Sequence, residues 1–377
     1  MSEEKYPHPA KIEIDLVQFR NNISIIRKHI GKAKFCLPVK ANAYGHGLVP
    51  MSKAAIEAGI DCLAVSCLQE GLRLRKANIH IPILVFGAIH EDQIENLIDL
   101  DLEIAIASKF KADLVASTCQ KLRKKCRIHL EVDTGMQRTG VRPSTAIDLF
   151  KTLKSHPFFE VVGIYSHLAS AETPDDPIAK KQIDLFFSLL DHPIFKDVPI
   201  VKHIANSDAV ANFPSAYLDM VRPGILTYGC LPKNSPESLR GVAPCFTLKA
   251  KVSYFKVVGK GEGVSYGHTF ITKQQTRIAT IPVGYGDGYY RSLSNKGSVL
   301  IRGKKYPIAG NICMDQFMVD LGSGEAYVGD EVVLVGKQGS EEIRLDEISQ
   351  LAGTIPNEVF CLFNERIPRI YFYPICA

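Results

Sequence analysis

The feature that most constrains the fold is a regular alternation of short apolar runs with longer amphipathic segments. Eight runs, most of them rich in β-branched residues, predict strands at 34–40, 62–66, 81–87, 103–107, 127–133, 160–166, 201–206 and 219–222. Apolar residues at three- and four-residue spacing predict helices at 16–30, 48–59, 68–78, 108–124, 144–155 and 177–190. This order predicts an α/β fold built on a (β/α)8 TIM-like barrel. An open doubly wound sheet is the alternative, because periodicity does not report closure.

The pattern changes after about residue 240, where short strands joined by turns replace the strand–helix alternation. The expected strands are 246–258, 277–284, 297–302, 305–309, 315–321 and 329–336, with one helix near 345–352. The Pro- and Asn-containing stretch 232–236 marks the boundary. We therefore expect a barrel in residues 1–238 and a mainly β domain in residues 239–377.

Composition excludes several classes of function. A net charge of +5 over 377 residues is too small to indicate nucleic-acid or anionic-membrane binding. The N-terminus lacks the apolar core of a signal peptide, and no run of about 18 apolar residues appears. The ten cysteines are scattered, with no CxxC pair. We expect a cytoplasmic protein with reduced, mostly buried thiols and no metal site.

Unusual polar residues fall at or just after the ends of the predicted strands. They are Lys40, Asp133, His167, Asn206 and Arg222. In a barrel those strand ends share one rim, where active sites are built. A lysine whose stem is buried has its neutral amine favoured, and this form attacks carbonyls and makes Schiff bases. A solvated strand terminus is the alternative for Lys40 by itself.

The rim after the last two predicted strands offers Asn206-Ser207 and Arg222-Pro223-Gly224-Ile225. Barrels bind phosphate at this position with a hydroxyl and backbone N–H groups. A reactive lysine that shares a rim with a phosphate site points to pyridoxal 5'-phosphate.

The sequence resembles the alanine racemase family from about residue 10 to 372, in both domains. The matching motifs, in order, are VKANAYGHG at 39–47, VDTGMQRTG at 132–140, GIYSH at 163–167, ANS at 205–207, VRPGI at 221–225, VSYG at 264–267, VGYGDG at 283–288 and CMDQ at 313–316. Single motifs are weak, but together they are highly specific.

The resemblance implies a homodimer, assembled head to tail, with shared active sites. Each site would combine the barrel of one subunit with the β domain of the other. The implied cofactor-binding residues are Lys40, Tyr44, Arg138, His167, Asn206, Ser207, Arg222, Gly224 and Ile225. The residues implied from the partner's β domain are Tyr266, Tyr285, Met314 and Asp315.

Individual roles are implied by the same resemblance. Lys40 resembles the lysine that holds the cofactor, and Arg222 the residue that faces its pyridine nitrogen. Tyr44, Ser207 and the Gly224–Ile225 backbone resemble the phosphate site. Arg138 resembles the arginine near the cofactor's phenolic oxygen and the substrate carboxylate.

The expected reaction removes the α-proton of alanine from one face of a planar carbanion and returns a proton on the other, most directly with two acid–base groups. Lys40 would serve one face and Tyr266 the other. Because a free tyrosine has a pKa of about 10, Tyr266 needs help near neutral pH, and His167 could polarise it. Arg222 does not give up a proton, so the pyridine nitrogen should stay unprotonated and side reactions should be suppressed.

Two positions depart from the family pattern. Many members carry a carbamylated lysine at the position of Glu131, and we predict that Glu131 instead pairs directly with Arg138. The family usually has a tyrosine at the position of Asn357, at the substrate entrance. Asparagine is smaller, so we expect relaxed preference toward serine.

The expected function is alanine racemisation, supplying D-alanine for peptidoglycan. A broader serine/alanine racemase is the first alternative. A barrel-type PLP amino-acid decarboxylase is a second, but it would want an acidic partner for the pyridine nitrogen in place of Arg222. A non-catalytic PLP carrier is a third, and it would leave the β domain without a use.

Overall fold

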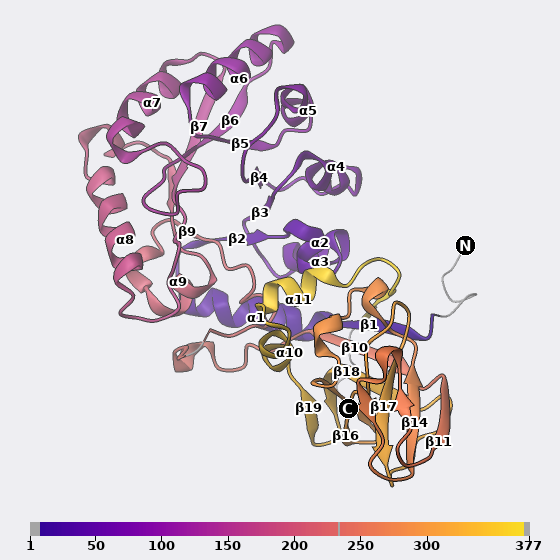
Figure 1. Cartoon of the computed structure of the whole chain (residues 1–377). Coiled ribbons are helices and arrows are strands. Elements are labelled where there is room, and N and C mark those ends of the chain that lie inside the picture. Colours follow the sequence, from indigo (N-terminus) through magenta and orange to yellow (C-terminus); the bar gives the residue numbers. More distant parts are fainter. Residues whose placement is uncertain (1–7, 233, 373–377) are drawn as a thin grey trace. The chain divides into compact units, whose positions relative to one another are not determined.

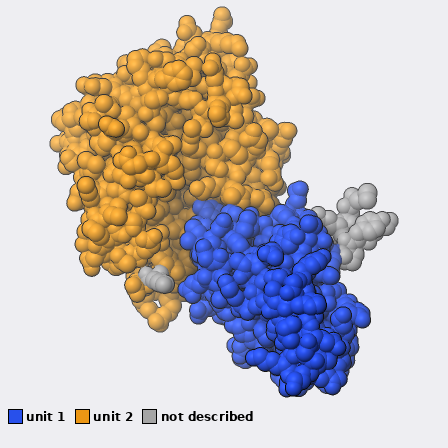
Figure 2. All heavy atoms as spheres, viewed as in Figure 1, with its two compact units in different colours: residues 1–17, 44–46, 244–377 blue, residues 18–43, 47–243 orange. Residues whose placement is uncertain are grey.

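The structure of the protein is a computed structural model that describes residues 8–232 and 234–372. The chain forms two compact units (Figure 2). The barrel unit contains residues 18–43 and 47–243, and the β unit contains the segment up to Val17, residues 44–46 and the chain from Pro244 onward. The expected split after residue 238 assigns the N-terminal segment to the barrel. The structure differs because β1 (Ala10–Asp15) pairs with β10 (Phe246–Lys251) and β20 (Arg369–Phe372).

Every strand predicted for the barrel is present; most are shorter than predicted, whereas β7 has the predicted length and is shifted by one residue. The strands are β2 (Lys34–Pro38), β3 (Cys62–Val65), β4 (Ile83–Val85), β5 (Glu103–Ile106), β6 (Cys126–Glu131), β7 (Phe159–Tyr165), β8 (Val201–His203) and β9 (Met220–Val221). They pair in parallel in the order β8-β7-β6-β5-β4-β3-β2-β9. Backbone hydrogen bonds from Asp219 to Lys202 (3.0 Å) and from Arg222 to Ala205 (2.9 Å) link the two end strands. The sheet is therefore barrel-like and not open.

Helices alternate with these strands along the chain (Figure 1). They are α1 (Leu16–Ile30), α3 (Leu48–Glu57), α4 (Leu68–Lys76), α5 (Ile94–Asp99), α6 (Lys109–Leu122), α7 (Pro143–Ser155), α8 (Pro177–Leu190) and α9 (Ser207–Asn212). Local chemistry explains where α8 begins. The Asp176 carboxylate accepts hydrogen bonds from the N–H groups of Ile178 (2.8 Å) and Ala179 (3.0 Å), and Pro177 occupies the first turn.

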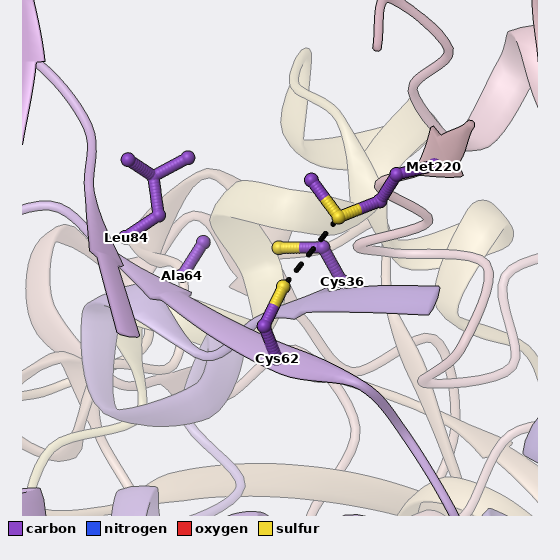
Figure 3. Close-up of a cluster of buried hydrophobic side chains, with 5 residues drawn as sticks. All are labelled: Cys36, Cys62, Ala64, Leu84 and Met220. Carbon is purple, nitrogen blue, oxygen red and sulfur yellow. Dashed lines mark hydrogen bonds between the residues drawn. The ribbon is translucent and has the colours of Figure 1, made fainter. Parts of the chain in front are cut away.

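Part of the barrel core is a cluster of small and sulfur-containing side chains (Figure 3). Its buried members are Cys36, Cys62, Ala64, Leu84 and Met220. Cys36 lies opposite Cys62 in the β2–β3 register, and the Cys62 thiol lies 3.6 Å from the Met220 sulfur. All cysteines within the described residues are free thiols, whereas Cys376 lies outside them.

The described residues of the β unit form three sheets. The largest has the order β16-β15-β18-β10-β1-β20, with β19 on β18; the others are β11-β14-β17 and β12-β13. The remaining strands are β11 (Tyr254–Val258), β12 (Gly263–Val264), β13 (Phe270–Ile271), β14 (Thr276–Ile281), β15 (Ser298–Ile301), β16 (Lys304–Pro307), β17 (Phe317–Gly322), β18 (Glu331–Gln338) and β19 (Glu341–Ile343). The expected strand 246–258 is two strands, because the chain changes from the largest sheet to the three-stranded one at residues 252–253. The expected helix is α10 (Leu345–Ala352), and it is followed by α11 (Pro356–Leu362), which the sequence pattern did not predict.

Candidate active site

Lys40 lies two residues beyond β2, which ends at Pro38 and not at the lysine as expected. The N–H of Val39 still donates to the carbonyl of Ala64 (2.8 Å), so the chain leaves the barrel just before Lys40. The lysine is half-buried. Next to it, the N–H of Ala41 donates to the carboxylate of Glu70 (2.6 Å). Lys40 therefore lies at the rim of the barrel.

Lys40 is the first residue of α2 (Lys40–Tyr44), and the residues after it form a left-handed turn. Four consecutive non-glycine residues have positive φ: 53° at Ala41, 55° at Asn42, 54° at Ala43 and 51° at Tyr44. This conformation costs roughly 1–2 kcal/mol per residue. Hydrogen bonds offset part of the cost, since the Asn42 side chain accepts from the N–H of Leu48 (2.9 Å). Strained backbone of this kind gathers at functional sites, where the surrounding structure holds it in place.

The Arg222 guanidinium lies inside the barrel, with 3% of the residue exposed. It donates to the carbonyl of Ser166 (2.7 Å) and to Nδ1 of His203 (2.7 Å). Its contact with Nδ1 of His167 is longer, at 3.4 Å. The guanidinium also lies 5.3 Å from the centre of the Tyr165 ring. Among the described residues its Nε has no acceptor, so one donor is left for a ligand.

His167 lies among three positive groups. Burial, followed by the charges of Arg222, Arg138 and Lys40, lowers the pKa of His167 to about 3. The imidazole is therefore neutral near neutral pH. The structure brings the lysine and both arginines together around it, although Arg138 itself is exposed.

The rim beyond β8 and β9 offers hydrogen-bond donors. Asn206 caps α9 by accepting from the N–H of Ala209 (3.0 Å), and the Ser207 hydroxyl accepts from the N–H of Leu226 (3.3 Å). The N–H groups of Gly224 and Ile225 donate to no group within residues 8–232 and 234–372. Pyridoxal phosphate fits these residues, because open amides and a hydroxyl suit its phosphate, the Lys40 amine suits its aldehyde, and Arg222 has a spare donor.

Tyr44 belongs to the part of the chain that packs with the β unit. It is buried, and burial together with Cys361 raises the pKa of its phenol. Gly45, the next residue, has a φ of 76°, and a Cβ there would lie 2.1 Å from the Phe360 carbonyl oxygen of α11. Only glycine, which has no Cβ, allows the backbone at position 45 to lie this close to the Phe360 carbonyl.

The predicted Glu131–Arg138 ion pair is wrong. Within the described residues no ion pair joins them, and the buried Glu131 carboxylate accepts a hydrogen bond from the Thr139 hydroxyl (2.6 Å). Thr139 and Arg138 lie in the same loop, and this loop returns to the end of β6. There the N–H of Val141 donates to the carbonyl of Glu131, and the N–H of Asp133 donates to the carbonyl of Val141. A buried carboxylate is thus satisfied by a neutral donor next to Arg138 in sequence.

In the β unit, Tyr266 stands on a strained turn and is 74% exposed. Ser265 before it has a φ of 66°, and its hydroxyl donates to the carbonyl of Asn311 (2.5 Å). The Asn311 amide in turn donates to the carbonyl of Tyr266 (2.8 Å). Gly310 lies so close that a Cβ there would be 2.5 Å from the Val264 carbonyl oxygen. The turn is fixed while the phenol points to solvent.

The loops that carry Tyr285, Met314 and Asp315 are joined by their backbones. The N–H of Tyr285 donates to the carbonyl of Cys313 (3.0 Å), and the N–H of Gly286 donates to that of Met314 (2.8 Å). The side chains of all three site residues are exposed, and Asp315 is paired with Arg366 (2.8 Å). A pocket that includes Tyr266 and Cys313 opens beside them. Asn357 is half-buried in the first turn of α11.

Two sets of polar residues near Arg222 and His167 were not recognised from the sequence. Gln182 of α8 is buried and donates to the carbonyl of His167 (3.0 Å) and to the Thr134 hydroxyl (3.3 Å). Glu103 and His203 lie in the barrel interior beside His129. A polar residue inside an apolar predicted strand is the signal that could have identified Glu103 and His203.

Two kinds of feature are absent from residues 8–232 and 234–372. No helix there is long and apolar enough to cross a membrane. Nor does that part of the chain gather three His, Cys, Asp or Glu side chains that could hold a metal ion.

A parallel barrel with a lysine, a buried guanidinium and open amides at its rim, followed by a β unit, defines a barrel-type enzyme that depends on pyridoxal phosphate. Comparison with known families makes the class specific. Residues 14–232 match the alanine racemase N-terminal domain, and residues 245–371 match the alanine racemase C-terminal domain.

Full-length relatives agree. The chain is 42% identical over 371 residues to an alanine racemase of Methanococcus maripaludis, covering 97% of this chain and 99% of that protein. It is 40% identical to the alanine racemase of Halothermothrix orenii, covering 98% of both. The crystal structure of alanine racemase from a D-cycloserine-producing Streptomyces lavendulae superimposes with a TM-score of 0.93 at 35% identity, covering 98% of both chains. The chain belongs to the alanine racemase family, whose members are isomerases.

Proposed function

We propose that the protein interconverts L- and D-alanine by two-base proton transfer in a homodimer with shared active sites. Lys40 serves one face of the substrate, and Tyr266 of the partner subunit serves the other. The observation that carries this proposal is the presentation of Tyr266, a large aromatic residue exposed on a turn that its own unit holds rigidly. Exposed aromatic residues on a fixed surface are typical of protein interfaces.

The chemistry requires a proton to leave one face of the α-carbon and another to arrive on the opposite face. Pyridoxal phosphate, when bound, supplies the electron sink for the negative charge left at that carbon. Lys40 and Tyr266 hold the two protons. Arg222 donates hydrogen bonds but does not release a proton, which moderates the sink and favours racemisation over decarboxylation.

The other site residues have supporting roles in this proposal. His167 is neutral because of its lowered pKa, and its Nδ1 faces Arg222, which can only donate. Its Nε2–H therefore donates a hydrogen bond to the Tyr266 oxygen and polarises the phenol. Ser207, with Tyr44 and the amides of Gly224 and Ile225, holds the phosphate. Asn206 supports that cradle as the cap of α9.

Arg138 has no ion pair within its own described chain and is exposed, so its charge is available to a substrate carboxylate. Tyr285, Met314 and Asp315 of the partner subunit complete the substrate side of the pocket in this proposal.

Complementation of two inactive chains tests the shared site. Lys40→Ala and Tyr266→Phe chains carrying different tags are co-expressed, and mixed dimers are isolated on both tags. If each site uses the barrel of one chain and the β domain of the other, one of two sites is intact and activity is about half that of the wild type.

The matched control pairs Lys40→Ala with the double variant Lys40→Ala/Tyr266→Phe, and such dimers have no intact site under either arrangement. Mixed dimers of the two single variants that remain as inactive as this control would refute a site shared between subunits.

We also propose that Asn357 relaxes the substrate preference toward serine. Asparagine leaves more room than the tyrosine usual in the family, and a contact of this kind is worth only about 1–3 kcal/mol. The Asn357→Tyr variant should therefore lower the serine-to-alanine ratio of kcat/KM without abolishing alanine turnover. An unchanged ratio would refute this role of Asn357.

The product's use is a further part of the proposal, supported by membership of the family. We propose that the enzyme works in the cytoplasm and supplies D-alanine for peptidoglycan. Disruption of the gene should make growth depend on added D-alanine, and growth without it would contradict the biosynthetic role.

A further inference from the structure

A continuous hydrogen-bond chain runs through the barrel interior from Arg222 to a buried carboxylate. The Arg222 Nη1 lies 2.7 Å from His203 Nδ1, and the His203 Nε2 lies 3.1 Å from His129 Nδ1. The His129 Nε2 then lies 2.9 Å from an oxygen of Glu103. All four residues are buried. The chain thus joins a cation at the cofactor side to an anion on β5.

A glycine in β7 leaves room for this hydrogen-bond chain. β7 lies between β6, which carries His129, and β8, which carries His203. Gly163 of β7 is paired with His129, and a Cβ there would lie 2.2 Å from the His129 Nδ1. Two residues further along β7, the Tyr165 ring stacks on His203 at 5.0 Å. The absent side chain at Gly163 therefore leaves the space that the imidazole of His129 occupies.

The proton positions along the chain have one solution with both imidazoles neutral. Arg222 can only donate, so His203 Nδ1 must accept. A neutral imidazole has one donor and one acceptor, so His203 Nε2–H donates to His129 Nδ1. His129 Nε2–H then donates to Glu103, whose carboxylate can only accept.

Charges at both ends support that solution. Burial, followed by the charge of Arg222, lowers the pKa of His203 well below its usual value, which keeps it neutral. Burial by itself would raise the pKa of Glu103, but the hydrogen bond from His129 and the charge of Arg127 outweigh it, so the carboxyl is ionised. Arg127 pairs with the other Glu103 oxygen at 3.1 Å and also with Asp101.

We propose that Glu103 is a positioning residue for the racemase reaction, because it fixes the tautomers of His129 and His203 and thereby holds an acceptor against Arg222. Without that acceptor, the Arg222 guanidinium would lose its 2.7 Å hydrogen bond to His203, and this bond would no longer orient the guanidinium. This inference rests on the proposed role of Arg222 at the cofactor. Glu103 acts through other residues and touches neither cofactor nor substrate.

The test is a nitrogen-15 spectrum of the imidazoles in the full-length holoenzyme labelled at histidine. His129→Asn and His203→Asn variants assign the two signals. In the wild type both rings should carry the proton on Nε2 and none on Nδ1. A wild-type spectrum with the proton on Nδ1 of either ring overturns the proposal, whatever any variant does.

Two substitutions of Glu103 separate its roles. Glu103→Gln keeps an acceptor oxygen of the same reach, so both tautomers should persist and kcat should stay within a few-fold of the wild type. Glu103→Leu removes the acceptor, so His129 should lose its fixed Nε2–H state and kcat should fall about tenfold or more, by analogy with the loss of a partner that orients a ligating side chain. If Glu103 had only a structural role, Glu103→Leu would lower the stability of the protein without changing the tautomer of His129.

The outcomes are distinct. Wild-type tautomers in a folded Glu103→Leu variant, or altered tautomers with unchanged racemisation, would overturn the inference. If Glu103→Leu does not fold, the wild-type spectrum and the Glu103→Gln variant still decide it. Failure of the proposed function has a separate signature, which is a wild-type holoenzyme that leaves L-alanine optically unchanged.

Discussion

Gly163→Ala should destabilise the barrel through one defined collision. The new methyl carbon would lie 2.2 Å from Nδ1 and 2.5 Å from Cε1 of His129, far inside contact distance. The backbone itself would accept alanine, since the φ of Gly163 lies outside the left-handed region. The only unfavourable effect expected from Gly163→Ala is therefore the steric overlap of its methyl group with the His129 imidazole.

The magnitude depends on the contacts that His129 must give up. The imidazole cannot retreat without lengthening its 3.1 Å bond to His203 and its 2.9 Å bond to Glu103. Each buried hydrogen bond left unmade costs about 1–3 kcal/mol, and overpacking costs a similar amount. The free energy of unfolding of the barrel should fall by about 4 kcal/mol.

Urea unfolding followed by circular dichroism measures this loss, and a double-mutant cycle identifies its origin. In a His129→Ala background the methyl group has space, so Gly163→Ala should cost less than about 1 kcal/mol there. Gly59→Ala is the matched control, because nothing lies within 4 Å of its Cβ and only its φ of 84° opposes alanine. It should cost about 1 kcal/mol. Equal losses from Gly163→Ala in both backgrounds would refute the reasoning.

Two further predictions concern the β unit and the active site. Gly45→Ala should destabilise the β unit by more than about 2 kcal/mol beyond Gly353→Ala, because both have φ near 75° but only Gly45 faces a backbone oxygen, that of Phe360 at 2.1 Å; equal shifts in urea midpoint would contradict this. His167 has a pKa of about 3 when folded and about 6.5 when unfolded, so acid favours the unfolded state. Its contribution should lower the free energy of unfolding by about 1.4 kcal/mol from pH 7.5 to 5.5. In His167→Asn, the free energy of unfolding measured in urea should change less between the two pH values, by that amount. An unchanged pH dependence would argue against a neutral imidazole in the folded protein.

The sequence by itself determined the strand and helix order of the barrel, the start of a second domain near residue 240 and the family. Alternation of apolar residues records which face of each element is buried, and that is local information. The glycine-rich motifs around Lys40 and Tyr266 identified the residues with chemistry because such turns need particular residues at fixed positions.

Only the tertiary structure decided what depends on contacts between distant segments. β1 joins the β unit because its partners, β10 and β20, lie more than two hundred residues away. Glu131 pairs with Thr139 because the loop returns to β6, which charge complementarity alone did not predict. The chain from Arg222 to Glu103 exists because four strands place donors and acceptors in register around Gly163. Periodicity reports which side chains face inward, but their distances from one another are set by how the strands pack.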